Sequence, residues 1–86
     1  MNTSVEISYY PLHNEFIPPI KDFIHRLSQY PDLVVNTNGM STQVFGKYKN
    51  VMPAITTEIE KSFELPHSVF ILKIVNTDLQ IHNKDQ

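Results

Sequence analysis

The stretch LVVNTNGMSTQVFG, residues 33–46, decides the fold because it has the pattern of two short strands joined by a turn. A first strand is expected over Leu33–Thr37, and a returning strand from about Ser41 to Tyr48. Between them, Asn38 and Gly39 predict a type I′ turn, in which both central residues take φ > 0. The stretch is therefore a β-hairpin, and the segments on either side of it set the topology.

An amphipathic helix is expected before the hairpin. Apolar residues there follow the i, i+3, i+4, i+7 spacing of one helical face: Ile20, Phe23, Ile24 and Leu27. The residue before a proline avoids the helical region, so the pair Pro18 and Pro19 makes Pro19 the expected first helical residue. Pro31 marks the end of this helix.

A second helix is expected after the hairpin. Its apolar stripe consists of Met52, Ile55, Ile59 and Phe63. We expect it to begin between Asn50 and Pro53 and to end before Pro66.

Two further strands complete the pattern. Residues 5–12 alternate apolar and polar side chains, and the segment SVFILKIV is apolar on nearly every residue from Val69 to Val75. The order strand–helix–strand–strand–helix–strand predicts an α+β ferredoxin-like sandwich, with two helices on one face of a four-stranded antiparallel sheet. We expect one domain over residues 1–86, with its core at about 4–76 and a frayed polar tail at 77–86.

Composition excludes several classes of function. The net charge is −2, and the basic residues do not cluster as a nucleic-acid site requires. No apolar run reaches the ~20 residues of a membrane span, and the amino terminus lacks the pattern of a signal peptide. We therefore expect no nucleic-acid or membrane partner and, by default, a cytoplasmic location. The chain has no cysteine, and its histidines lack metal-site spacing, so no metal is expected.

The uncovered face of the sheet predicts an oligomer. The helices cover the face that takes Val5 and Ile7, which leaves the opposite face without an element to cover it. The last strand is apolar on both sides, and such an edge strand is a liability unless something packs on it. We expect a homo-oligomer, a dimer or tetramer, that forms through this open face and this edge strand.

Polar and aromatic side chains gather on the open face and at the hairpin end. Five side chains are expected to project from the open face. They are the carboxylate of Glu6, the polar groups of Ser8 and Gln43, and the aromatic rings of Tyr10 and Phe45. The hairpin end adds the hydroxyls of Thr37, Ser41 and Thr42. This mixture is typical of a small-molecule pocket. The alternative is ordinary strand and turn chemistry, with a solvated Glu6 and aromatic residues at a subunit interface.

The segments VEISYYPL, PPIKDFIHRL and TNGMSTQVFG together resemble the small thiamine/hydroxymethylpyrimidine-binding family, the YkoF-type thiamine-binding domain. The resemblance covers roughly residues 4–76. Its most specific part is the run Thr37, Asn38, Gly39, Met40, Ser41, Thr42 and Gln43. It implies a single-domain member that assembles into dimers or tetramers and binds its ligand where two ferredoxin-like units meet.

The ligand that the resemblance implies is thiamine or its hydroxymethylpyrimidine part. Ser41, Thr42 and Gln43 would hydrogen-bond the pyrimidine edge, Tyr10 or Phe45 would stack on it, and Glu6 would favour the thiazolium cation. We expect a binding protein of vitamin salvage or uptake with no cofactor, and not an enzyme, because no nucleophile–base pair is visible. The alternative is an ACT-like regulatory or oligomerisation module that binds another small ligand or none.

Overall fold

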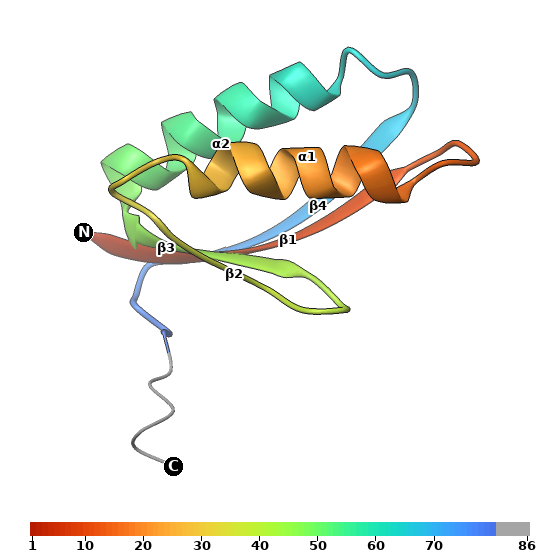
Figure 1. Ribbon diagram of the computed structural model, residues 1–86. Coiled ribbons are helices and arrows are strands. Elements are labelled where there is room, and N and C mark those ends of the chain that lie inside the picture. The colour runs from red at the N-terminus through yellow and green to blue at the C-terminus, as the bar shows by residue number, and fades with distance from the viewer. Residues whose placement is uncertain (81–86) are drawn as a thin grey trace.

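The structure, a computed structural model, describes residues 1–80. Its elements in chain order are β1 (Asn2–Pro11), α1 (Ile17–Ser28), β2 (Val34–Thr37), β3 (Thr42–Lys47), α2 (Tyr48–Ser62) and β4 (Ser68–Val75). The sheet has the order β2-β3-β1-β4, and all neighbouring strands are antiparallel. Both helices lie on one face of the sheet (Figure 1). The ferredoxin-like α+β sandwich is confirmed, with β1 and β3 in the centre.

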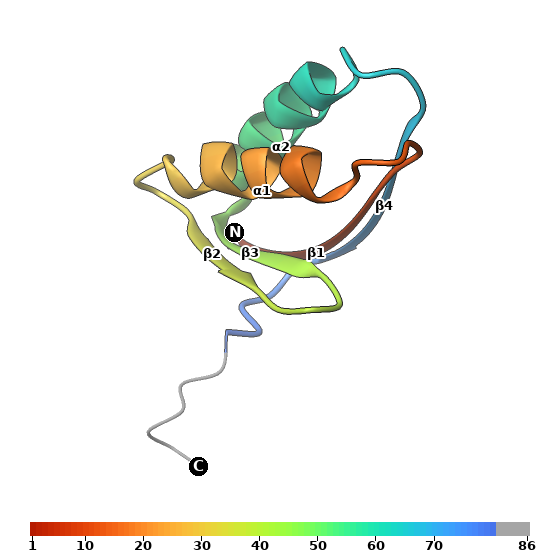
Figure 2. The same cartoon turned by 45° about the vertical axis from the view of Figure 1, so that its right-hand side comes forward.

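Figure 2 shows in a second view that both helices lie over the same face of the sheet, and the hydrophobic core lies between these two layers. Val5, Ile7 and Val44 of the central strands are at most 2% exposed. They pack with residues of both helices: Phe23, Leu27, Val51 and Ile55. The alternation of β1 therefore assigns its two faces as expected.

Helix α1 begins at Ile17, two residues before the expected start at Pro19. The first four N–H groups of a helix have no acceptor within the helix, so Pro18 and Pro19 fit its first turn without losing a hydrogen bond. The sequence rule correctly finds the prolines at the helix start but places the boundary too late.

Helix α2 begins at Tyr48, directly after β3, and includes Pro53. Its buried residues are Val51, Ala54, Ile55, Glu58 and Ser62. Of the expected stripe, Phe63 follows the helix and is 55% exposed. The expected stripe is therefore wrong at Phe63. Two polar residues of α2, Glu58 and Ser62, are buried instead, and the side chain of Arg26 from α1 hydrogen-bonds both of them.

The hairpin turn differs from the expected type I′ turn. Within residues 1–80, His67 is the only non-glycine residue with positive φ, and neither glycine has one. Instead, Oδ1 of Asn38 accepts hydrogen bonds from the backbone N–H groups of Met40, at 2.7 Å, and Ser41, at 3.1 Å. The asparagine side chain therefore organises a four-residue loop, residues 38–41, that does not need left-handed backbone.

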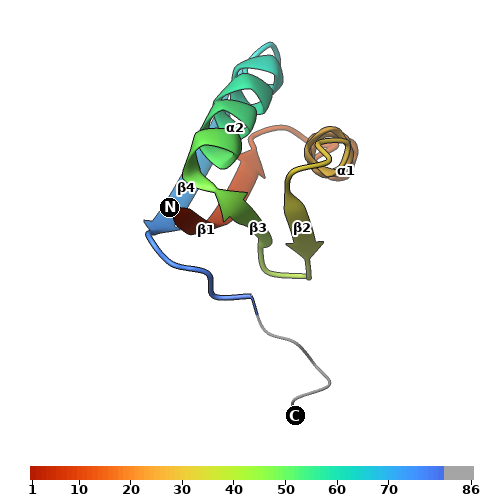
Figure 3. The same ribbon diagram turned by 90° about the vertical axis from the view of Figure 1, so that its left-hand side faces the viewer.

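Residues 77–80 are not frayed, contrary to expectation. The hydroxyl of Ser4 donates to the carbonyl of Thr77 at 2.8 Å and accepts from the N–H of Leu79 at 2.9 Å. The chain after β4 leaves on the side of the sheet away from the helices (Figure 3). The rest of the expected tail, residues 81–86, lies outside the described residues. No helix within residues 1–80 has the length and apolar character needed to cross a membrane.

Candidate functional site

The face of the sheet away from the helices, which we call the open face, carries part of the expected site. Glu6 lies opposite Gln43 in the β1–β3 register, and Ser4 lies opposite Phe45. Cross-strand partners share a face, so Gln43 and Phe45 project from the open face beside Glu6, as expected from the burial of Val44.

A shallow depression of about 660 Å³ lies on the open face. Its lining includes Ser4, Glu6, Gln43, Phe45, Lys73, Val75 and Leu79. Nζ of Lys73 lies 3.4 Å from Oε1 of Glu6, but these side chains are 84% and 41% exposed. Such a solvated ion pair contributes at most about 1 kcal/mol. The carboxylate is therefore paired but not buried.

A second hollow, the α1–hairpin groove, lies on the helix side of the sheet. It has a volume of about 450 Å³, within the range typical of ligand pockets. Its lining comes from the end of β1, the start of α1 and the hairpin tip: Ile7, Tyr9, Tyr10, Pro11, Leu12, Phe16, Ile20, Phe23, Ile24, Thr37, Asn38, Gly39, Met40, Ser41 and Thr42. The groove is thus a concave site with apolar walls and one polar end.

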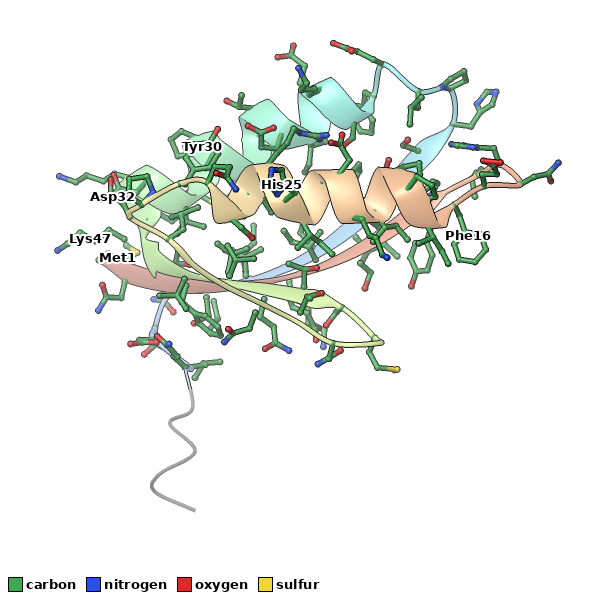
Figure 4. All side chains as sticks on the ribbon, viewed as in Figure 1. Met1, Phe16, His25, Tyr30, Asp32 and Lys47 are labelled. Atoms are coloured by element: carbon green, nitrogen blue, oxygen red, sulfur yellow. The ribbon has the colours of Figure 1, made fainter. Side chains whose placement is uncertain are left out.

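The walls of the α1–hairpin groove are aromatic. The rings of Tyr9 and Phe23 meet edge to face at 5.5 Å between centroids, and Phe70 of β4 stacks on Tyr9 at 4.1 Å. These contacts fix the two groove-lining rings from behind. Phe16 stands at the start of α1, where Figure 4 labels it, and is 52% exposed. A flat ligand would therefore meet the exposed ring of Phe16, whereas Phe23, which is 1% exposed, belongs to the core behind the groove.

The polar end of the groove is formed by hydroxyls whose hydrogens are already engaged. Oγ1 of Thr37 donates to the carbonyl of Ser41 at 3.3 Å, and it lies 3.1 Å from Oγ1 of Thr42. Because Thr37 has one hydroxyl hydrogen, Thr42 supplies the hydrogen between them. Oγ of Ser41 donates to Oε2 of Glu6 at 3.0 Å. The hydroxyls of Thr37 and Thr42 therefore offer lone pairs at this end of the groove, whereas the hydroxyl of Ser41 turns to Glu6 on the open face.

The expected site residues consequently divide between two surfaces. Glu6, Gln43 and Phe45 line the depression on the open face. Seven others line the α1–hairpin groove: Tyr10, Thr37, Asn38, Gly39, Met40, Ser41 and Thr42. Ser8 lines neither hollow. The hydrogen bond between Ser41 and Glu6 joins the two surfaces.

Sequence reasoning missed the groove walls. Ile20, Phe23 and Ile24 follow the helical stripe and were assigned to the core, yet they also border the groove. Tyr9 continues the alternation of Val5 and Ile7 along β1 and also borders the groove. The available signal was the loop PLHNEFIPP, residues 11–19, whose apolar Leu12 and Phe16 lie outside any regular element and are exposed.

The most strongly connected polar cluster lies between the helices, away from the groove. Arg26 donates to Oε1 of Glu58 at 2.7 Å, and the hydroxyl of Tyr30 donates to Oε2 at 2.7 Å. Burial raises the pKa of Glu58, but these hydrogen bonds and the charge of Arg26 outweigh it and lower that pKa. The hydrogen bond to Glu58, with burial, raises the pKa of Tyr30. All these groups are engaged with one another, which indicates a structural role.

A metal site has no support in the part of the chain that the structure covers. No group of three or more His, Cys, Asp or Glu residues in 1–80 is placed to hold an ion.

Solved structures share the fold at low sequence identity. The chain is similar to a hypothetical protein from Methanocaldococcus jannascii, with 24% identity and a TM-score of 0.77 over 93% of this chain and 84% of that one. It is similar to a candidate thiamine biosynthesis/salvage protein from Thermotoga maritima, with 17% identity and a TM-score of 0.83 over 98% and 95% of the two chains. A protein from Streptococcus pneumoniae has 17% identity and a TM-score of 0.80 over 99% and 97%. No model of a known protein family and no curated protein matches the chain.

Proposed function

We propose that the chain binds thiamine or its hydroxymethylpyrimidine part in the α1–hairpin groove and serves vitamin salvage or uptake. The observation that carries this proposal is the pair of hydroxyl acceptors on Thr37 and Thr42 in a groove that is otherwise lined largely by apolar and aromatic side chains. A ligand that fits must bring hydrogen-bond donors on the edge of a flat ring.

An aminopyrimidine has these properties. Its exocyclic amino group donates two hydrogen bonds, which the neighbouring hydroxyl oxygens of Thr42 and Thr37 can accept. Its ring nitrogens accept, and the side-chain amide of Asn38 can donate to them, because Oδ1 of that residue already serves the loop backbone. The exposed rings of Tyr10 and Phe16, which line the groove, supply the apolar ring faces.

The Thermotoga maritima structure supports this proposal, because that protein is described as a candidate for thiamine biosynthesis or salvage. Its TM-score of 0.83 shows a shared fold, and at 17% identity the likeness concerns the fold alone. The resemblance of the hairpin run, residues 37–43, to the thiamine-binding family points in the same direction.

We further propose binding without turnover, and a homo-oligomer. The groove lining is aliphatic, aromatic, hydroxyl and amide in character, which suits recognition rather than proton transfer. A second copy is the partner that we propose for the open face and β4. Val69, Ile71 and Val75 of β4 are 37–57% exposed there, and β4 is an edge strand.

Calorimetry with thiamine and with hydroxymethylpyrimidine tests the function. We expect saturable heat with at least one of them, and a thermal shift that matches it. A ligand at 100 times its dissociation constant stabilises the folded state by about 2.7 kcal/mol. If neither compound gives heat or a thermal shift at a concentration about 100 times a micromolar dissociation constant, binding with micromolar affinity is refuted.

A further inference from the structure

The α1–hairpin groove contains no charged side chain within residues 1–80. Its lining is aliphatic, aromatic, hydroxyl-bearing or amide-bearing, and includes no Lys, Arg, His, Asp or Glu. A phosphate group carries almost two negative charges at neutral pH and is bound in proteins by cations or by converging N–H groups. The side chains of the groove therefore offer no positive charge that would compensate a phosphate for its lost water.

The backbone next to the groove is also poorly suited to anions. Phe16 and Ile20 line the groove, so the start of α1 lies at its edge. A helix start usually binds anions through its first N–H groups. Here Pro18 and Pro19 occupy the first turn, and proline has no N–H to donate. Two of the first four N–H donors of α1 are therefore missing at the edge of the groove.

We propose that the groove selects the unphosphorylated ligand and rejects its phosphate esters. This inference rests on the proposed function and adds the chemical state of the ligand. A positively charged ligand is not rejected in the same way, because exposed aromatic faces such as those of Tyr10 and Phe16 attract cations. Thiamine and its uncharged pyrimidine alcohol therefore remain ligands, whereas thiamine monophosphate does not.

The selection places the protein in a reaction sequence. A ligand bound without phosphate must come from uptake or from a reaction that removes phosphate. A phosphoryl-transfer reaction on the released ligand must follow if the phosphate ester is the form that is used. The groove would then hold the vitamin precursor before such a kinase step.

The test compares calorimetric titrations of thiamine and hydroxymethylpyrimidine with those of their monophosphate esters at one salt concentration. We expect each ester to bind at least tenfold more weakly than its parent compound. Esters that bind as tightly as their parents would overturn the selection and leave the proposed function intact. Failure of all four compounds to bind would overturn both.

A variant pair tests the role of the prolines. Pro18→Ala with Pro19→Ala restores two N–H donors, so the ratio of ester to parent dissociation constants should fall at least threefold. Pro31→Ala, which lies outside α1, is the matched control and should leave the ratio unchanged. Circular dichroism establishes that each variant is folded. An unchanged ratio in the folded double variant would overturn the part assigned to Pro18 and Pro19.

Discussion

Oγ of Ser41 donates a hydrogen bond to Oε2 of Glu6 at 3.0 Å, which ties the hairpin tip to the central strand β1. Ser41 borders the α1–hairpin groove, whereas Glu6 lies on the open face and pairs with Lys73 of β4. The bond turns the Ser41 hydroxyl to the open face. Ligand contacts in the groove are therefore directly connected to the surface on which we propose that a second copy packs.

Thr42→Val should weaken thiamine or pyrimidine binding about tenfold, equivalent to about 1.4 kcal/mol. The valine keeps the shape of the buried side chain but removes the oxygen that accepts from the ligand. Calorimetry measures the change. Ser8→Ala is the control, because Ser8 lies on the neighbouring strand and lines neither hollow. Equal affinity for Thr42→Val and the native chain would contradict the assigned role.

The two glycines should respond differently to alanine. A Cβ on Gly46 would lie 3.1 Å from the backbone oxygen of Asp32 and 3.1 Å from Cγ2 of Val51, whereas a Cβ on Gly39 would meet nothing within 4 Å. Gly46→Ala should therefore lower the free energy of unfolding by about 1–3 kcal/mol, as overpacking does. Gly39→Ala should change it by less than about 1 kcal/mol. Urea unfolding measures both, and equal losses would disprove this distinction.

Glu58→Gln should lower the free energy of unfolding at pH 7 by about 1–3 kcal/mol, because Arg26 and Tyr30 both donate to the carboxylate. The pKa of Glu58 is lowered from 4.5 in the folded state. Its contribution is therefore present above the unfolded pKa and is lost as the pH falls through the folded one. The difference between the native and variant chains should shrink in urea titrations at pH below 4.5.

Tyr30→Phe provides a second variant for the same cluster. It removes the hydroxyl donor but keeps the carboxylate, so the pKa of Glu58 should rise and the acid-dependent loss of stability should begin at higher pH. An unchanged acid profile would show that the hydrogen bond does not contribute to the pKa of Glu58.

The pattern of apolar residues predicted the topology because each element has one periodicity and one covered face. Val5 and Ile7 alternate with Glu6, and this alone assigns the faces of β1. The hairpin turn could not be predicted in the same way, since Asn38 has two routes to a turn: left-handed backbone or side-chain hydrogen bonds to the N–H groups of Met40 and Ser41.

The groove was beyond sequence reasoning for a different reason. Phe23 shows the helical spacing of a core residue, and it is one: it is 1% exposed and also borders the groove. Whether a core side chain also forms a pocket wall depends on the distance between α1 and the hairpin tip. No local sequence pattern predicts that distance. Likewise, no local pattern reveals the buried pair of Glu58 and Arg26, because these residues are 32 positions apart in the sequence.

His67 has φ of 61°, a left-handed conformation between α2 and β4, and its carbonyl accepts from the N–H of Leu12 at 3.0 Å. A β-branched residue is strained there, so His67→Val should lower the free energy of unfolding by about 1–2 kcal/mol. His67→Asn, which tolerates this conformation, is the matched control and should change it little. Thermal unfolding of both measures the difference. A Val variant as stable as the Asn variant would argue against the left-handed backbone.

Ile71→Lys should dissociate the proposed oligomer while leaving the fold intact. Ile71 is 57% exposed on the open face of β4, opposite Ser8 of β1, so its replacement opens no cavity in the core. A lysine there would place an unpaired charge in an interface between copies, and edge strands use such charges to prevent association. Sedimentation velocity at micromolar concentration should show a dimer or tetramer for the native chain and a monomer for Ile71→Lys. Tyr48→Lys, 48% exposed at the start of α2, is the control and should assemble normally. A native chain that sediments as a monomer would eliminate the oligomer and leave the open face of β4 without the partner proposed for it.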